Sequence, residues 1–141
     1  MDISALIGPF EIQFLVGLIL SVGIGYLIGA ERESRNKDAG ISTHILVISG
    51  AMLFTMISGV IDPLSTSRIA SQVVVGIGFL GAGLILKDGI NVRNLTTAGS
   101  IWFAAAVGMA IGYGFYVIAL IAGLVCALVP RIPNLHKPER H

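Results

Sequence analysis

The chain alternates long apolar runs with short polar segments, and five of these runs are long enough to suggest membrane-spanning helices. A helix needs roughly 17–20 predominantly apolar residues to cross a hydrocarbon core of about 30 Å. The pattern therefore predicts an all-α polytopic membrane bundle. We expect this bundle to be a single domain over residues 1–141. Its spans are expected at about Ile12–Ala30, His44–Ile61, Ile69–Leu86, Leu95–Gly112 and Phe115–Val129.

Two glycine-containing segments, Val22–Leu27 and Val75–Leu80, are identical except that Tyr26 corresponds to Phe79. This similarity predicts two parallel helical hairpins related by an axis along the membrane normal, followed by a fifth helix; chance similarity is the alternative. Gly23 and Gly25 would then correspond to Gly76 and Gly78.

The short segments between the apolar runs carry turn and capping signals. Ser42-Thr43 and Thr96-Thr97 open the second and fourth runs, where hydroxyl side chains suit helix N-caps. Gly112-Tyr113-Gly114 separates the last two runs and predicts a tight turn, with a single long tilted helix as the alternative.

Small residues recur at every fourth position of three runs, which places them along one strip of each helix. The strips are Gly17, Ser21, Gly25 and Gly29; Ser100, Ala104, Gly108 and Gly112; and Ala119, Gly123 and Ala127. We expect close helix packing at these strips and along the third run. The glycines assigned to packing are Gly25, Gly29, Gly76, Gly78, Gly81, Gly83 and Gly108.

Composition and charge support a membrane protein with a defined orientation. Hydrophobic residues make up 55% of the chain, and the mean hydropathy is +0.88. Lys and Arg near span ends tend to stay cytoplasmic. An external N-terminus places every Lys and Arg inside except Arg68, and it predicts a cytoplasmic C-terminus.

Several site classes find no support in the sequence. Cys126 is the only cysteine, so an intrachain disulfide and a cysteine cluster for zinc are excluded. Gly76–Gly81 has the GxGxxG spelling but lacks the preceding strand and the later acidic residue of a dinucleotide site. We expect no enzyme activity, no cofactor and no nucleic-acid partner.

Polar residues at the span ends are the remaining candidates for function, although such charges usually only solvate or pair. Carboxylates there could attract a hydrated Mg²⁺, which prefers oxygen ligands. The candidates are Glu31, Arg32, Glu33, Thr43, His44, Asp62, Arg68, Gln72, Thr96 and Thr97.

The run from Gly29 to Tyr113 resembles the membrane domain of the MgtC/SapB family. The matching pieces are Ile28–Glu33, Ala39–Val47, Asp62-Pro63, Arg68–Val74, Gly76–Gly83 and Leu95–Ala98. The resemblance implies a bacterial inner-membrane protein linked to magnesium limitation and, in pathogens, to virulence. Longer members carry a soluble C-terminal domain, which we do not expect here.

Two functional hypotheses follow. The first is a membrane protein that acts through protein partners during magnesium or acid stress. The family resemblance suggests the rotary ATP synthase as a partner, and self-association is expected. The second is a transporter or channel for Mg²⁺ or another cation, with Asp62 on the outside and Glu31 and Glu33 on the inside.

Overall fold

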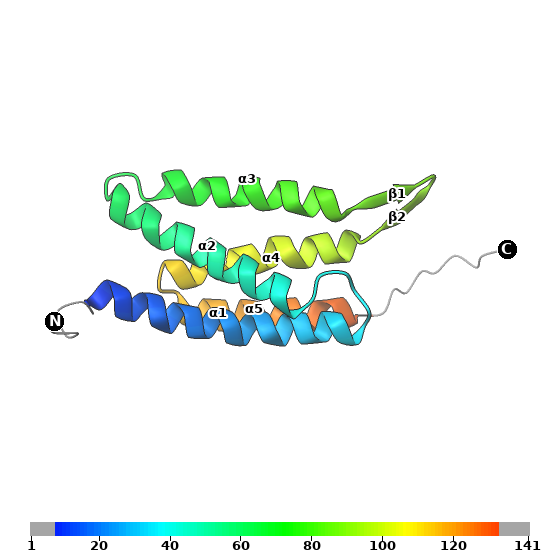
Figure 1. The fold of residues 1–141 in the computed structure, drawn as a ribbon, viewed down its shortest axis with the longest axis horizontal. Helices are drawn as coiled ribbons and strands as arrows, with labels where there is room; N and C mark the ends of the chain where they lie inside the picture. Colours follow the sequence, from blue (N-terminus) through cyan, green and yellow to red (C-terminus); the bar gives the residue numbers. More distant parts are fainter. Residues whose placement is uncertain (1–7, 133–141) are drawn as a thin grey trace.

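The computed structural model describes residues 8–132, which form a bundle of five helices (Figure 1). Each helix runs antiparallel to the one before it in the chain. Lys137 and Arg140, which contributed to the charge pattern, lie outside the described residues. The helices are α1 (Pro9–Ser34), α2 (Ile41–Ile61), α3 (Ser67–Leu84), α4 (Leu95–Gly112) and α5 (Tyr116–Leu128). The all-α fold predicted from the sequence is confirmed.

Four of these helices, α1 to α4, are long and apolar enough to cross a membrane. Helix α5 has 13 residues and is shorter than the predicted fifth span, although the 3-10 helix η2 (Val129–Arg131) continues it. The turn after Gly112 is confirmed. Gly114 adopts φ +79°, and the Phe115 N–H donates to the Ala110 carbonyl over 2.8 Å, which ends α4.

Helices α1, α2 and α4 form the centre of the bundle. Their facing side chains are almost fully buried, including Ile28, Ile48, Met52 and Ile111, each at most 1% exposed. Helix α5 closes one side against α1 and α4, and α3 packs on α2 and α4 at the edge of the bundle. Apolar side chains therefore fill most of the middle of the bundle, where the hydroxyl of Ser21 is also buried and donates to Met52 Sδ over 3.6 Å.

The small-residue strips of α1, α4 and α5 are buried along their whole length, as predicted. A Cβ atom at Gly25 would lie 2.8 Å from the Ile45 Cα, and one at Gly108 would collide with the Ile48 carbonyl oxygen. Gly29 likewise faces the backbone of Ile41. These glycines let the three central helices approach each other closely.

The packing prediction is wrong for three of the four glycines assigned on α3. No atom outside the local helix lies within 4 Å of a Cβ placed at Gly76, Gly78 or Gly83, whereas Gly81 faces Ala98 at 3.8 Å. Helix α3 contacts its neighbours through Ala70, Ile77 and Gly81, and the other glycines lie off this strip. Only 17% of the residues of α3 are buried in the bundle, compared with 56% of the residues of α4.

This difference also bears on the predicted repeat. The two hairpins run in the same sense, with α1 parallel to α3 and α2 parallel to α4 (Figure 1). Gly23 and Gly76 share an open environment, but Gly25 is packed where Gly78 is not. The environments of the two hairpins therefore differ, and their structural superposition stays a prediction.

The two hydroxyl pairs are not N-caps. Helix α2 begins after Gly40 and α4 after Asn94, so Ser42-Thr43 and Thr96-Thr97 lie within the first helical turns. The first N–H group of α2 is capped by a side chain from α1 instead: Glu33 Oε1 accepts the Ile41 N–H at 2.9 Å. Local spacing could not show this tertiary cap.

A short β-hairpin joins α3 to α4, where the sequence suggested only a polar loop. Strands β1 (Leu86–Asp88) and β2 (Asn91–Arg93) pair in antiparallel register, Leu86 with Arg93 and Asp88 with Asn91. Gly89 has φ +59° in the two-residue turn. The hairpin, the α1–α2 loop and η2 all lie at the same end of the bundle (Figure 1).

Adding one methyl group should distinguish packed glycines from open ones. We expect Gly108→Ala to lower the free energy of unfolding by about 1–3 kcal/mol, since the methyl group must displace backbone. Gly76→Ala should be neutral or should stabilise by up to about 1 kcal/mol, because alanine favours a helix. Thermal unfolding in detergent measures both. Equal losses for the two variants would contradict the packing described for α3 and α4.

Candidate functional site

A cluster of buried polar side chains lies at the end of the bundle that carries the hairpin. It comprises residues from α1, α2, α4 and α5, namely Glu31, Arg32, His44, Thr97, Ser100 and Cys126. Four of the sequence candidates, Glu31, Arg32, His44 and Thr97, come together here. Residues far apart in the sequence thus form one site.

Arg32 lies at the centre of this cluster and is only 1% exposed. Its Nη2 donates to Thr97 Oγ1 over 2.9 Å, which links α1 to α4. Its Nε has no hydrogen-bond partner among the described residues. A buried guanidinium with an unpaired N–H lowers the stability of the fold unless another group accepts that hydrogen bond.

A chain of hydrogen bonds continues from Thr97 into the bundle. Ser100 Oγ donates to the Thr97 carbonyl over 2.8 Å, and His44 Nε2 lies 3.3 Å from Ser100 Oγ. The other ring nitrogen, Nδ1, is 2.8 Å from the Gly40 carbonyl and therefore carries a proton. Cys126 Sγ completes the cluster, 3.6 Å from the Ser100 carbonyl.

Glu31 is buried beside Arg32 but interacts with two other arginines. Its Oε1 lies 3.6 Å from Arg35 Nε and 3.8 Å from Arg131 Nε, and its side chain is 2% exposed. The pair with Arg131 joins the end of α1 to η2, and Arg131 reaches Glu31 only because α5 packs against α1.

Three further candidates, Glu33, Thr96 and Thr43, lie at the same end of the bundle but outside the cluster. Glu33 points to the start of α2 and accepts the Ile41 N–H. Thr96 is exposed beside the cluster and lines the adjoining cavity, and Thr43 is half-buried on α2.

The outer candidates form a separate group at the opposite end of the bundle. Asp62 Oδ1 accepts the Ser65 N–H at 3.1 Å, and its Oδ2 lies 3.5 Å from Arg68 Nη1. Gln72 is exposed next to this pair. Asp62 therefore shapes the α2–α3 turn and lies at the far end of the bundle from Glu31.

The sequence pattern did not single out Ser100 and Cys126 as members of the cluster, or Arg35 and Arg131 as the partners of Glu31. Ser100 was noticed only as a member of a small-residue strip, and Cys126 only as a lone cysteine. A serine on the packed strip of α4, one turn from Thr97, was the available signal. Nothing local could indicate that Arg131 pairs with Glu31.

Thr97 and Thr96 offer a matched test of the buried hydrogen bond. Thr97→Val removes the acceptor of Arg32 Nη2, so we expect it to lower the free energy of unfolding by about 1.5–3 kcal/mol. Thr96→Val makes the same chemical change at an exposed neighbour and should cost no more than about 0.5 kcal/mol. Unfolding in mixed micelles measures both, and equal effects would contradict the assigned hydrogen bond.

Comparison with known proteins places this architecture in a family. The model of the MgtC family matches residues 18–136. The protein MgtC of Salmonella typhimurium (strain LT2) is 44% identical over 125 residues, covering 89% of this chain and 52% of the relative. No solved structure matches.

Two further relatives show the same relationship. The Escherichia coli (strain K12) protein "Putative magnesium transporter YhiD" is 44% identical over 126 residues, covering 83% of this chain and 59% of the relative. MgtC of Brucella abortus is 47% identical over 100 residues, covering 70% and 42%. The chain spans about half the length of these curated relatives. It belongs to the MgtC family.

Proposed function

We propose that this bacterial multi-pass membrane protein acts in the response to low magnesium by binding a protein partner in the membrane. The family assignment supports the link to magnesium. The family resemblance suggests the rotary ATP synthase as the partner. The observation that carries the proposal is that arginines, rather than carboxylates, organise the buried polar cluster.

The apolar core supports partner binding over ion conduction. Between the two polar ends, the space among α1, α2 and α4 is filled by Ile28, Ile48, Met52 and Ile111. Among residues 8–132, charged side chains are confined to the ends of the bundle and the loops. An ion crossing this core would meet apolar side chains along the middle of the bundle, at a high desolvation cost.

Cation transport is the second candidate, favoured by the name of the Escherichia coli relative. The carboxylates named for it are dispersed: Glu31 faces two arginines, Glu33 caps α2, and Asp62 pairs with Arg68. Within the described part of the chain, no group of three His, Cys, Asp or Glu residues could hold a metal ion. This arrangement favours partner binding.

The outer face of α3 is the proposed contact surface for a partner or for a second copy of the chain. Gly76 and Gly83 are open there, and Phe79 is 82% exposed. Small residues allow another helix to approach closely, and an exposed phenylalanine adds apolar contact area. Residues 8–132 leave this face uncovered.

We infer that the arginine-rich end is cytoplasmic. Arg32, Arg35, Lys37, Lys87, Arg93 and Arg131 all belong to that end, while Arg68 lies at the other. This distribution follows the tendency of basic loops to stay inside.

Labelling of single cysteines in intact cells tests the orientation. In a Cys126→Ala background, we expect an impermeant maleimide to label Ser65→Cys and to leave Lys37→Cys and Lys87→Cys unlabelled until the cells are opened. The reverse pattern would contradict the orientation.

Reconstitution separates the two functional candidates. Liposomes containing only this protein should show Mg²⁺ uptake no faster than protein-free liposomes, because the core is filled. Uptake that saturates and is lost in Glu31→Gln would overturn the partner proposal in favour of transport.

The partner itself can be tested in inverted membrane vesicles. We expect the protein to reduce ATP-driven proton pumping, and we expect Phe79→Ala on α3 to weaken this effect. Ile118→Ala, on the exposed face of α5, is the matched control and should behave like the unchanged protein. No effect on pumping at normal protein abundance would exclude the ATP synthase as the partner.

A further inference from the structure

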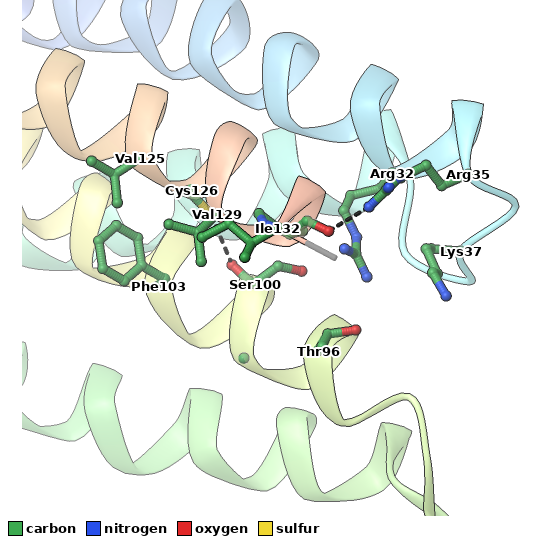
Figure 2. A pocket seen from close by; sticks show the side chains of 12 residues that line it. Arg32, Arg35, Lys37, Thr96, Ser100, Phe103, Val125, Cys126, Val129 and Ile132 are labelled. Carbon is green, nitrogen blue, oxygen red and sulfur yellow. Dashed lines mark hydrogen bonds between the residues drawn. The ribbon is translucent and has the colours of Figure 1, made fainter. Parts of the chain in front are cut away.

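A cavity of about 830 Å³ adjoins the buried polar cluster. Arg32 borders it from α1, Arg35 and Lys37 from the segment that follows, and Thr96 and Ser100 from the start of α4 (Figure 2). No carboxylate is among the described residues that line it. The polar side of the cavity therefore carries three cationic side chains.

The first turn of α4 adds hydrogen-bond donors to this side. The Asn94 side chain makes no capping hydrogen bond to the helix, and its Nδ2 donates to Asp38 Oδ2 at 2.5 Å. The N–H groups of the first turn have no acceptor within their own helix, and the helix dipole makes this terminus attractive to anions. Thr96 and Gly99, at and just after this turn, both line the cavity.

Arg32 provides an independent indication of a ligand. The guanidinium is almost fully buried, Nη2 is used by Thr97, and Nε lacks a partner among the described residues. In Figure 2 its guanidinium extends from α1 toward the start of α4 near Thr96. An oxyanion between these groups would lie beside the guanidinium charge of Arg32, which has no ion pair among the described residues, and would meet the helix N-terminus.

The neighbouring carboxylates face groups other than Arg32 and Lys37, although neither carboxylate oxygen of Glu31 has a hydrogen-bond partner among the described residues. Glu31 lies within 3.6–3.8 Å of Arg35 and Arg131, Asp38 accepts from Asn94, and Glu33 accepts the Ile41 N–H. The described residues provide no ion pair within 4.0 Å for Arg32 or Lys37. Positive charge therefore remains on the cavity wall.

The opposite wall of the same cavity is apolar. It is formed by Phe103 of α4, Val125 of α5, and the segment around η2, where Val129 and Ile132 are exposed. A free phosphate ion would leave this wall in contact with water, whereas an amphiphile would cover it. The cavity also lies at the end of the bundle, where lipid headgroups are found in a membrane.

We propose that this cavity binds a phosphate group, carried by an anionic phospholipid. The phosphate lies between Arg32, Lys37 and the first turn of α4, and the glycerol and upper acyl chain lie against Phe103, Val125 and Val129. The site is independent of the proposed protein partner, because it lies at the end of the bundle and the proposed contact face lies on α3.

Binding to the purified full chain in detergent tests the site. Three probes are titrated by calorimetry: short-chain phosphatidylglycerol, short-chain phosphatidylcholine and inorganic phosphate. We expect phosphatidylglycerol to saturate at one per chain and to bind about tenfold or more tightly than either of the other probes. Lys37→Gln and Arg32→Gln should each weaken it by about tenfold.

Two further variants separate the contributions. Lys87→Gln removes a cation from the β-hairpin, outside the cavity but at the same end, and should leave the affinity within about twofold. Val129→Ser should weaken phosphatidylglycerol without changing the affinity for inorganic phosphate. If Arg32→Gln fails to fold, Lys37→Gln, in an exposed loop, carries the test.

Each outcome assigns or removes the site. Equal binding of inorganic phosphate and phosphatidylglycerol, both weakened by Lys37→Gln and neither by Val129→Ser, would overturn the lipid and assign free phosphate. Absence of saturable binding for all probes would overturn the proposal. Equal losses from Lys37→Gln and Lys87→Gln would do the same, because they would indicate nonspecific charge attraction.

Discussion

The burial of Arg32 is the interaction on which the arginine-rich end of the bundle depends. A guanidinium cannot give up its proton, so its burial requires hydrogen-bond acceptors. Thr97 supplies one of them from α4 at 2.9 Å. Through Ser100, the same helix holds His44 of α2 and Cys126 of α5. One charged side chain thereby links polar groups from four helices.

Close helix approach makes this arrangement possible. Gly29 precedes Arg32 by almost one turn and lies against the backbone of Ile41, and Gly108 does the same against Ile48. Larger residues would separate α1, α2 and α4 and lengthen the distances between their polar groups. The small-residue strips therefore set the spacing at which Arg32 can reach Thr97. In this bundle, packing in the core and chemistry at the end are coupled.

The sequence predicted the helices well because membrane spans are defined by local length and polarity. Helix α4 begins and ends where the pattern placed it, at Leu95 and Gly112. The pattern failed on α3. Its glycines indicate that another helix can approach closely, but they do not indicate whether that helix belongs to this chain. Gly78 and Gly25 have nearly identical sequence surroundings, yet only Gly25 meets another helix within the described residues.

The same limit applies to the candidate site. Glu31, Arg32, His44 and Thr97 were recognisable because polar residues at the ends of apolar runs are conspicuous. Their partners were not, because Ser100 resembles a packing residue and Arg131 resembles a flanking charge until α5 is placed beside α1. Glu33 shows the reverse case. It was grouped with Glu31 by adjacency, but the helix turns the two side chains toward different neighbours, Ile41 and Arg131.

We infer that cations and helix N–H groups, rather than carboxylates, define the chemistry of this site. Electron paramagnetic resonance of Mn²⁺, a spectroscopic substitute for Mg²⁺, measures cation binding on the purified chain. We expect no saturable Mn²⁺ binding, with spectra that match those of Mn²⁺ in protein-free micelles. A stoichiometric bound signal that disappears in Glu31→Gln would contradict this inference.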